Sequence, residues 1–324
     1  MNFKIVFLPT IDLLFFTFPK IISFYISFFC FSISCFLYLF LRGKKEDIIY
    51  SNETLPLFFT SFIFRNTFYE MHDFPESKLS LFSIFLKRVR WILVHNKWKI
   101  KRLHKLFKIN LNKVFYEANA VDIKKFDIQI SKNEARERLS LPSDKKIIMY
   151  TGHLYVWKGV DVLALASRSL PENIITVFVG GTNTDILEFK KKYSDIGNIL
   201  IIGNRKHEEI PLWQKAADIL VLPNTAKIDI SNYYTSPMKL FEYMASKRPI
   251  IASEIPSITE ILNEKNAILI PPDNPKILTD TIVKVCNDSV LERLESIANT
   301  AYSGVQEHSW QKRAHRILSF THGY

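Results

Sequence analysis

Residues 146–181 read KIIMYTGHLYVWKGVDVLALASRSLPENIITVFVGG, and this stretch decides the fold class. A short apolar strand, KIIMYT, leads through a glycine and an aromatic loop into a helical stretch that begins at Gly159. A second apolar strand, ITVFVGG, follows. Apolar strands that alternate with helices are typical of a parallel sheet covered by helices. The stretch therefore predicts part of a doubly wound α/β sheet, which binds ligands at the carboxyl ends of its strands.

The same alternation continues toward the C-terminus. After residue 181 the pattern predicts helices over 183–193 and 207–216, strands over 198–203, 218–224, 249–253 and 267–270, and further helices after Asn274. Before residue 131 it predicts four short strands, within 46–53, 66–73, 90–96 and 112–119. Ser131 and Glu134 have the spacing of a helix capping box and precede a Pro-Ser-Asp turn, so the domain junction is expected there. We expect a first domain over 1–130, a second over 131–305 and a C-terminal helix over 306–324.

The two halves differ in composition. Residues 1–150 hold 22 of the 26 Phe and carry 24 Lys and Arg against 13 Asp and Glu, which accounts for the whole net charge of +11. Residues 77–116 contain no acidic side chain but many basic ones, from Lys78 to Lys113. Such a segment is expected to seek an anionic partner, such as an anionic membrane surface. A nucleic-acid partner is not expected, because no stacking module or recognition motif accompanies the charge.

Residues 21–41, IISFYISFFCFSISCFLYLFL, carry no charge, and Arg42, Lys44 and Lys45 follow them. The segment is long enough to cross a bilayer, in which case the positive-inside rule places the rest of the chain in the cytoplasm. A helix seated in one leaflet and a buried core helix are the alternatives. A cleaved signal peptide is not expected, since the apolar stretch is too long for one. The three cysteines form no disulfide framework and no zinc motif, as is usual in a reducing cytoplasm.

The stretch TSPMKLFEYMAS, residues 235–246, predicts a helix with an unexpected lysine in its first turn. Ser236 and Pro237 predict the helix start, which places Lys239 where the helix dipole disfavours a cation. Lys239 and Glu242 share one polar stripe. Two interpretations remain open, a solvated i, i+3 ion pair and a phosphate site at the helix start.

Several motifs in order resemble the retaining glycosyltransferases of family 4, group 1, which have the GT-B fold. The motifs are SPMKLFEYMASKRPIIASEIPSITEIL (236–262), YTGHLYVWKGVD (150–161), EANAVDIKKF (117–126) and HSWQKRA (308–314). The resemblance implies two Rossmann-like doubly wound domains facing a cleft. It also implies a nucleotide-sugar donor and transfer with retention of configuration. The family usually opens with a strand and a glycine-rich loop, and no glycine precedes Gly43. Two alternatives are therefore expected: a shortened N-terminal domain with its hydrophobic helix seated in a membrane, or a reading frame that has lost its true beginning.

The resemblance also implies roles for individual residues. Glu242 is expected to bind the donor ribose, Lys158 and Lys239 the phosphates, and His72 the transferred sugar. The expected catalytic residues are therefore His72, Lys158 and Glu242. The remaining donor-binding residues are expected to be His153, Gly180, Gly181, Ser236, Pro237, Met238 and Leu240, and no metal or other cofactor is expected, since no Asp-x-Asp motif is present.

Three residues depart from the family pattern. Tyr234 stands where the family usually has a glutamate, His153 where it usually has arginine, and Ala120 where it has glycine. The expected function is transfer of a sugar to a membrane or lipid-linked glycan acceptor at the cytoplasmic face of the cell membrane, in surface polysaccharide or glycolipid synthesis. Given these departures, the alternative is a non-catalytic binding or scaffold protein derived from such an enzyme.

Overall fold

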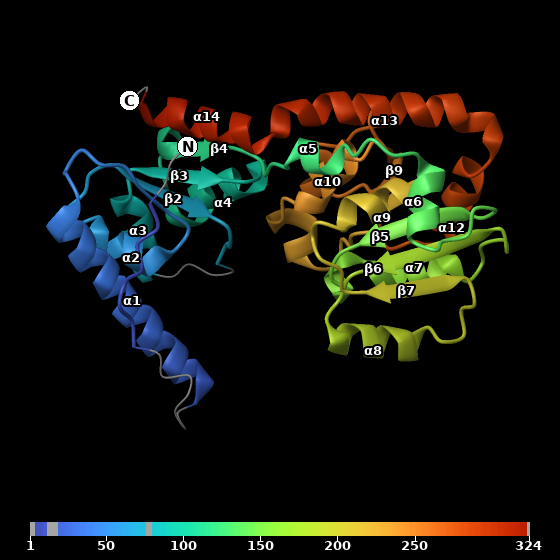
Figure 1. Cartoon of the computed structure of the whole chain (residues 1–324). Coiled ribbons are helices and arrows are strands. Elements are labelled where there is room, and N and C mark those ends of the chain that lie inside the picture. The colour runs from blue at the N-terminus through green and yellow to red at the C-terminus, as the bar shows by residue number, and fades with distance from the viewer. Residues whose placement is uncertain (1–3, 12–18, 76–79, 323–324) are drawn as a thin grey trace. The chain divides into compact units, whose positions relative to one another are not determined.

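The computed structural model describes residues 4–11, 19–75 and 80–322, so Lys78 of the basic segment lies outside the described residues. The chain forms two compact units, Met1–Glu117 and Ala118–Tyr324 (Figure 1). The division thus precedes the predicted junction after residue 130. The reason is that residues just after Glu117 bond within the second unit. Asn119 Nδ2 donates to Ser236 O at 2.7 Å, and Tyr302 donates to Asp127 Oδ2 at 2.6 Å.

The first unit contains a parallel sheet of four strands in the order β1-β2-β3-β4. The strands are β1 (Ile49–Ser51), β2 (Thr67–Met71), β3 (Trp91–Val94) and β4 (Val114–Tyr116), which confirms all four predicted strands. Helices α2 (Thr54–Thr60), α3 (Ser80–Arg88) and α4 (Lys97–Phe107) connect them. Neighbouring strands pair in simple register, for example Glu70 with Leu93. Every residue of β2 and β3 is buried, so the carboxyl ends of these two strands emerge from the centre of the unit.

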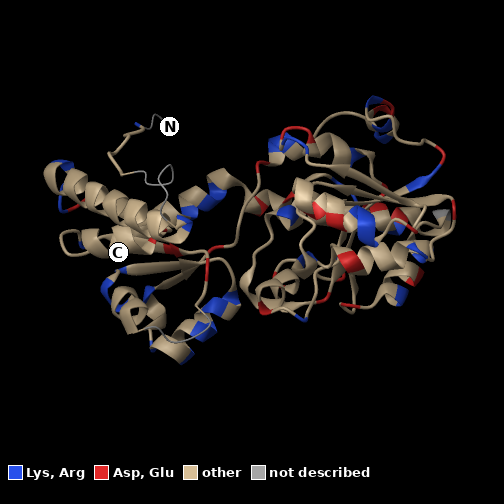
Figure 2. Ribbon diagram, turned by 90° about the horizontal axis from the view of Figure 1, so that it is seen from below, with Lys and Arg blue, Asp and Glu red and all other residues tan. Residues whose placement is uncertain are grey.

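Not all of the basic segment faces solvent. Figure 2 shows more blue than red ribbon in the first unit, in line with its positive charge. Lys99 is nevertheless only 1% exposed, and its ammonium donates to the backbone oxygens of Met71 (3.0 Å) and His72 (2.6 Å). Lys113 donates to two backbone oxygens at the end of α3. These two lysines use their charges inside the unit, so they are not available to the anionic partner that the segment is expected to seek.

The apolar segment, residues 21–41, forms helix α1 (Lys20–Arg42). It packs beside α2, with the rings of Phe29 and Phe59 6.0 Å apart (Figure 1). An 18-residue part of this helix has a mean hydropathy of 2.1, and only 6% of that part is buried. This low burial is contrary to the buried core helix that the sequence left open. By length and composition α1 can cross a membrane, although an N-terminal signal sequence meets the same criteria.

The second unit contains six parallel strands in the order β10-β9-β8-β5-β6-β7. They are β5 (Lys146–Thr151), β6 (Ile174–Val179), β7 (Ile199–Gly203), β8 (Ile219–Leu222), β9 (Ile250–Ser253) and β10 (Ile268–Ile270), in agreement with the predicted strands. This is the Rossmann order, and the strand sequence reverses between β5 and β8. Since crossovers between parallel strands are right-handed as a rule, this reversal places helices on both faces of the sheet. The predicted ligand site is thus at the carboxyl ends of β5 and β8.

Helices of the second unit follow the predicted alternation. They are α5 (Ile123–Phe126), α6 (Lys132–Arg138), α7 (Val160–Ser167), α8 (Asn183–Lys192), α9 (Ile210–Ala216), α10 (Met238–Ala245), α11 (Pro256–Thr259), α12 (Pro275–Val285), α13 (Leu291–Val305) and α14 (Trp310–His322). Short turns η1 (Leu111–Lys113), η2 (Val156–Lys158), η3 (Ile230–Tyr234), η4 (Asp288–Val290) and η5 (Gln306–His308) complete the chain. Ser131 caps α6 as predicted, by accepting the N–H of Glu134 at 3.1 Å.

Candidate functional site

Two glycines shape the carboxyl ends of β5 and β6. Gly152 follows β5 with φ +127°, and Gly180 follows β6 with φ +121°. A Cβ at Gly180 would lie 2.5 Å from Gly152 O, and one at Gly152 would lie 2.6 Å from Lys239 Nζ. Side chains are therefore excluded at both positions. The backbone of Gly180 thus lies close to that of Gly152, and the space above Gly152 is taken by the Lys239 ammonium.

The start of α10 differs by one residue from the prediction. The helix begins at Met238 with Pro237 as its N-cap, and no side chain caps it. Ser236 is therefore not the N-cap, because its Oγ and O accept instead from Asn119 N–H (3.4 Å) and Nδ2 (2.7 Å). Leu240 does not offer its side chain to a ligand, since that side chain is fully buried in the core.

Lys239 lies in the first turn of α10, as predicted, but it does not pair with Glu242. Its Nζ lies 3.7 Å from the centre of the Tyr150 ring, and among the described residues it forms no ion pair. Burial lowers the pKa of Lys239 well below its usual value, the nearby Lys158 ammonium lowers it further, and Glu242 opposes the shift. The solvated i, i+3 ion pair is therefore absent from this part of the structure.

Lys158 supplies a second cation at the same place. It ends the turn η2, and its Nζ lies 3.8 Å from the centre of the Trp157 ring. Burial lowers the pKa of Lys158 to about 8. The two ammonium groups are partly buried and repel each other, and each lies over an aromatic ring without an ion pair among the described residues. Together they form an electrostatically incomplete site. A ligand with two adjacent negative charges would complete it.

Glu242 lies one turn further along α10 and contacts His207, a residue that the sequence did not single out. His207 Nε2 lies 3.1 Å from Glu242 Oε1, and its Nδ1 lies 2.8 Å from Lys125 Nζ. Since an ammonium can only donate, Nδ1 is the acceptor and Nε2 carries the proton toward Glu242. The Glu242 carboxylate is 13% exposed, so it is held in place but still accessible.

The other expected donor-binding residues surround these groups. His153 is exposed and stacks on Tyr155 at 4.9 Å with an angle of 3° between the rings, and its backbone oxygen accepts from Tyr150 OH. Gly181 is buried at φ +93°. Met238 is 46% exposed at the helix start, where backbone N–H groups have no partner within the helix.

His72 lies in the first unit, directly after β2. Its side chain is 52% exposed, and its Nε2 lies 3.4 Å from Glu70 Oε1. His95, directly after β3, places its own Nε2 3.1 Å from the same oxygen, and Tyr50 donates to Glu70 Oε2. One possible metal-binding group is found among the described residues. Its donor atoms, from Glu70, His72 and His95, lie within 4.8 Å of one another.

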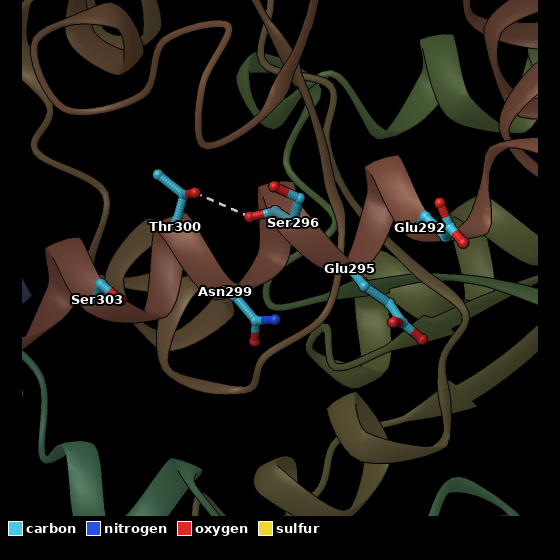
Figure 3. Close-up of a pocket in the computed structure, with 6 residues that line it drawn as sticks. All are labelled: Glu292, Glu295, Ser296, Asn299, Thr300 and Ser303. Atoms are coloured by element: carbon cyan, nitrogen blue, oxygen red, sulfur yellow. Dashed lines mark hydrogen bonds between the residues drawn. The ribbon is translucent and has the colours of Figure 1, made fainter.

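One hollow of about 550 Å³ lies elsewhere. Figure 3 shows that polar side chains of a single helix, α13, line it, with Thr300 donating to Ser296 O at 2.8 Å. The lining includes Glu292 and Glu295 but no expected site residue. The α13 hollow is therefore not the candidate site.

Comparison with known proteins agrees with this architecture. The sequence model of the family described as "Glycosyl transferases group 1" matches residues 145–288. The D-inositol 3-phosphate glycosyltransferase of Xylanimonas cellulosilytica is 24% identical over 67% of this chain and 52% of its own length. The putative teichuronic acid biosynthesis glycosyltransferase TuaC of Bacillus subtilis is 26% identical over 54% of this chain and 41% of its own. The chain spans about half the length of the curated relatives it matches.

Solved structures show the same fold. Anabaena HepE, crystallised with UDP, has a TM-score of 0.74 and 18% identity, with 89% of this chain and 82% of that chain covered. Sucrose-phosphate synthase of Thermosynechococcus elongatus has a TM-score of 0.76 and 18% identity, with 95% and 80% covered. With its two parallel α/β sheets, this chain has the GT-B fold. In sequence, its residues 145–288 are similar to the group 1 glycosyltransferases.

Proposed function

We propose that this protein is a glycosyltransferase that binds a nucleotide-sugar donor through its second unit. The supporting observation is the pair of cations Lys158 and Lys239, because each has a lowered pKa and neither forms an ion pair with a described residue. The Lys239 ammonium fills the space above Gly152. A nucleoside diphosphate offers two adjacent anionic groups to such a pair. The UDP in the HepE crystals is consistent with a ligand of this class.

The ribose would be bound one turn further along α10, by Glu242. His207 occupies Oε1 of this carboxylate, so Oε2 is the oxygen that we propose accepts from the ribose hydroxyls. Lys158, Lys239 and the free N–H groups at the start of α10 would stabilise the charge of the leaving diphosphate. These groups supply positive charge without a metal, so we propose metal-independent transfer.

In the proposed reaction the acceptor hydroxyl attacks the anomeric carbon on the face from which the diphosphate leaves. The bond between carbon and phosphate oxygen breaks as the new glycosidic bond forms, and the departing phosphate oxygen takes the hydroxyl proton. The products are a glycoside with retained configuration and a nucleoside diphosphate. We propose that His72 contacts the transferred sugar.

The acceptor is proposed to be a lipid-linked or other membrane glycan, with the protein on the cytoplasmic face of the membrane. In addition to α1, the first unit exposes Phe62 (58%), Leu81 (80%) and Ile84 (55%). The guanidinium of Arg88 lies 3.7 Å from the centre of the Phe62 ring. Exposed apolar groups next to basic ones fit an anionic lipid surface. TuaC and the lipopolysaccharide core mannosyltransferase LpsB of Rhizobium meliloti, a 25% identical relative, have names consistent with a role in surface polysaccharide synthesis.

Donor turnover tests the enzymatic proposal. Purified full-length protein should release UDP or GDP from one member of a panel of UDP- and GDP-sugars, in the presence of EDTA, and transfer should be faster with membrane lipid extracts. A scaffold protein would bind the nucleoside diphosphate without turnover, since the departures at His153 and Tyr234 could remove catalysis but leave binding. Absence of both binding and turnover would contradict the proposal.

Flotation with liposomes tests the membrane proposal. The protein should float with vesicles that contain anionic lipid, and carbonate should not extract it if α1 spans the bilayer. Release by high salt would instead show a purely electrostatic attachment. Equal recovery in the soluble fraction with neutral and anionic vesicles would contradict membrane binding.

A further inference from the structure

Glu70, His72 and His95 form a cluster at the carboxyl ends of β2 and β3. Glu70 and His72 are two residues apart on one chain, so they point to the same side of the sheet, and β3 delivers His95 beside them. The two imidazole rings are 4.6 Å apart, and both Nε2 atoms face Glu70 Oε1. The cluster differs from a surface ion pair because Glu70 and His95 are buried while His72 is half-exposed.

We propose that Glu70 is a positioning residue that holds the imidazole of His72 in one tautomer and one orientation toward the sugar. This inference rests on the proposed function for the role of His72 but not for its geometry. A carboxylate can only accept, so Nε2 of neutral His72 carries the proton toward Glu70, which leaves Nδ1 as the acceptor at the exposed side. Nδ1 is then suited to accept a hydrogen bond from a sugar hydroxyl.

The residues around Glu70 fix the carboxylate itself. Tyr50 donates to Oε2, which directs Oε1 toward the two histidines. Burial, the largest influence, lowers the pKa of His95, although Glu70 opposes the shift, so burial favours the neutral form of this imidazole beside the carboxylate. The Lys99 ammonium donates to the backbone oxygens of Met71 and His72 and so fixes the backbone on which His72 is carried.

A metal ion is the competing interpretation of the same three donors. Two histidines and a carboxylate resemble an open zinc site. The buried Lys99 ammonium beside the cluster already supplies a positive charge, which would repel a divalent cation. A direct contact between the carboxylate and the histidines needs no further charge, so we favour positioning.

The test is a double-mutant cycle on donor turnover. Glu70→Gln keeps the shape but removes the charge, and we expect kcat/KM for the donor to fall about tenfold, a coupling within the range found for contacting residues. In a His72→Ala background the same substitution should have no further effect. Tyr50→Phe should act in the same direction but more weakly. The matched control is Glu53→Gln, which changes an exposed carboxylate of the same unit and should leave turnover unchanged. Additive losses in the cycle would overturn the inference.

A second measurement does not depend on activity. In protein labelled with ¹⁵N-histidine, the ring-nitrogen shifts of His72, assigned from the His72→Ala spectrum, should report the Nε2–H tautomer. Glu70→Gln should shift the signal toward a tautomer mixture, and an unchanged signal would overturn the inference. One-to-one binding of Zn²⁺ that Glu70→Gln abolishes would also overturn it in favour of a metal site. If no donor is turned over but the tautomer shift occurs, the proposed function fails and the positioning geometry stands.

Discussion

Each unit of the protein has lysine side chains withdrawn from solvent near the carboxyl ends of its strands, but the ammonium groups have different neighbours in the two units. In the first unit, backbone oxygens of Met71 and His72 accept from the Lys99 ammonium. In the second, the ammonium groups of Lys158 and Lys239 lie over aromatic rings. Burial lowers the pKa of Lys99 and of Lys158 alike, to about 8. A shifted pKa therefore does not distinguish a structural lysine from a binding lysine, whereas the presence of hydrogen-bond acceptors does.

The largest effect is expected for Lys99, the structural lysine in this comparison. Lys99→Ala should lower the free energy of unfolding by about 3–5 kcal/mol, because it leaves a cavity and two buried carbonyl groups without their donor. Nucleoside diphosphate affinity at temperatures below the melting transition should stay within about twofold. Denaturant unfolding and calorimetric titration measure the two quantities. Lys101→Ala, at an exposed position of the same helix, is the control and should change neither. A loss of affinity without a loss of stability would show that Lys99 is a binding residue.

The next largest effect is expected for Lys239, one of the two lysines that we propose bind phosphate. Lys239→Gln should weaken nucleoside diphosphate binding by about 1.5–3 kcal/mol, because a charged contact to phosphate is lost. The apo protein should become more stable by up to about 1 kcal/mol, since a cation is removed from a helix N-terminus. Calorimetric titration and thermal melts test both signs. Lys190→Gln on α8 is the exposed control. Unchanged affinity would mean that the cation pair does not bind phosphate.

A third variant separates the phosphate and ribose ends of α10. Glu242→Ala should reduce the preference for a ribonucleoside over a deoxyribonucleoside diphosphate by about 1.5 kcal/mol, because a hydrogen bond to a charged group is lost. Lys239→Gln should leave that preference intact. Titration of both variants with both ligands provides the measurement. Equal loss of affinity for the two ligands in Glu242→Ala would contradict a ribose contact.

The smallest expected effect is a dependence on pH. Phosphate binding needs protonated Lys158, whose pKa is about 8, so affinity should fall about twofold between pH 7 and pH 8 and further above it. Lys158→Met should flatten this step. For Lys99 the same lowered pKa acts on stability with the opposite sign. The unfolded chain binds the additional proton between pH 8 and about 10.5, so this group adds stability as pH rises through that window. Affinity that is constant from pH 7 to pH 9 would contradict the assignment of Lys158.

Sequence patterns identified the strands and most helices because apolar periodicity and helix signals are local. The four strands of the first unit and the alternation from β5 onward are confirmed. The helix start was placed one residue early, because Ser236 bonds to Asn119, a residue 117 positions away. The division between units was placed too late, because contacts of residues 119 and 127 with the second unit are likewise not local.

The sequence by itself determined the parallel α/β class, because apolar strands that alternate with helices are typical of such a sheet. The shared ligand site of Lys158, Lys239 and Glu242 was implied by the resemblance to family 4 glycosyltransferases, and it stays a prediction. Only the tertiary structure decided the partners of these groups. Lys239 lies over Tyr150 rather than beside Glu242, Glu242 contacts His207, and Glu70 joins His72 to His95. Side-chain partners depend on distances of a few ångströms between segments that are remote in the chain, and periodicity carries no information on such distances. The physical difference between the structural lysine and the two lysines that we propose bind phosphate lies in those contacts.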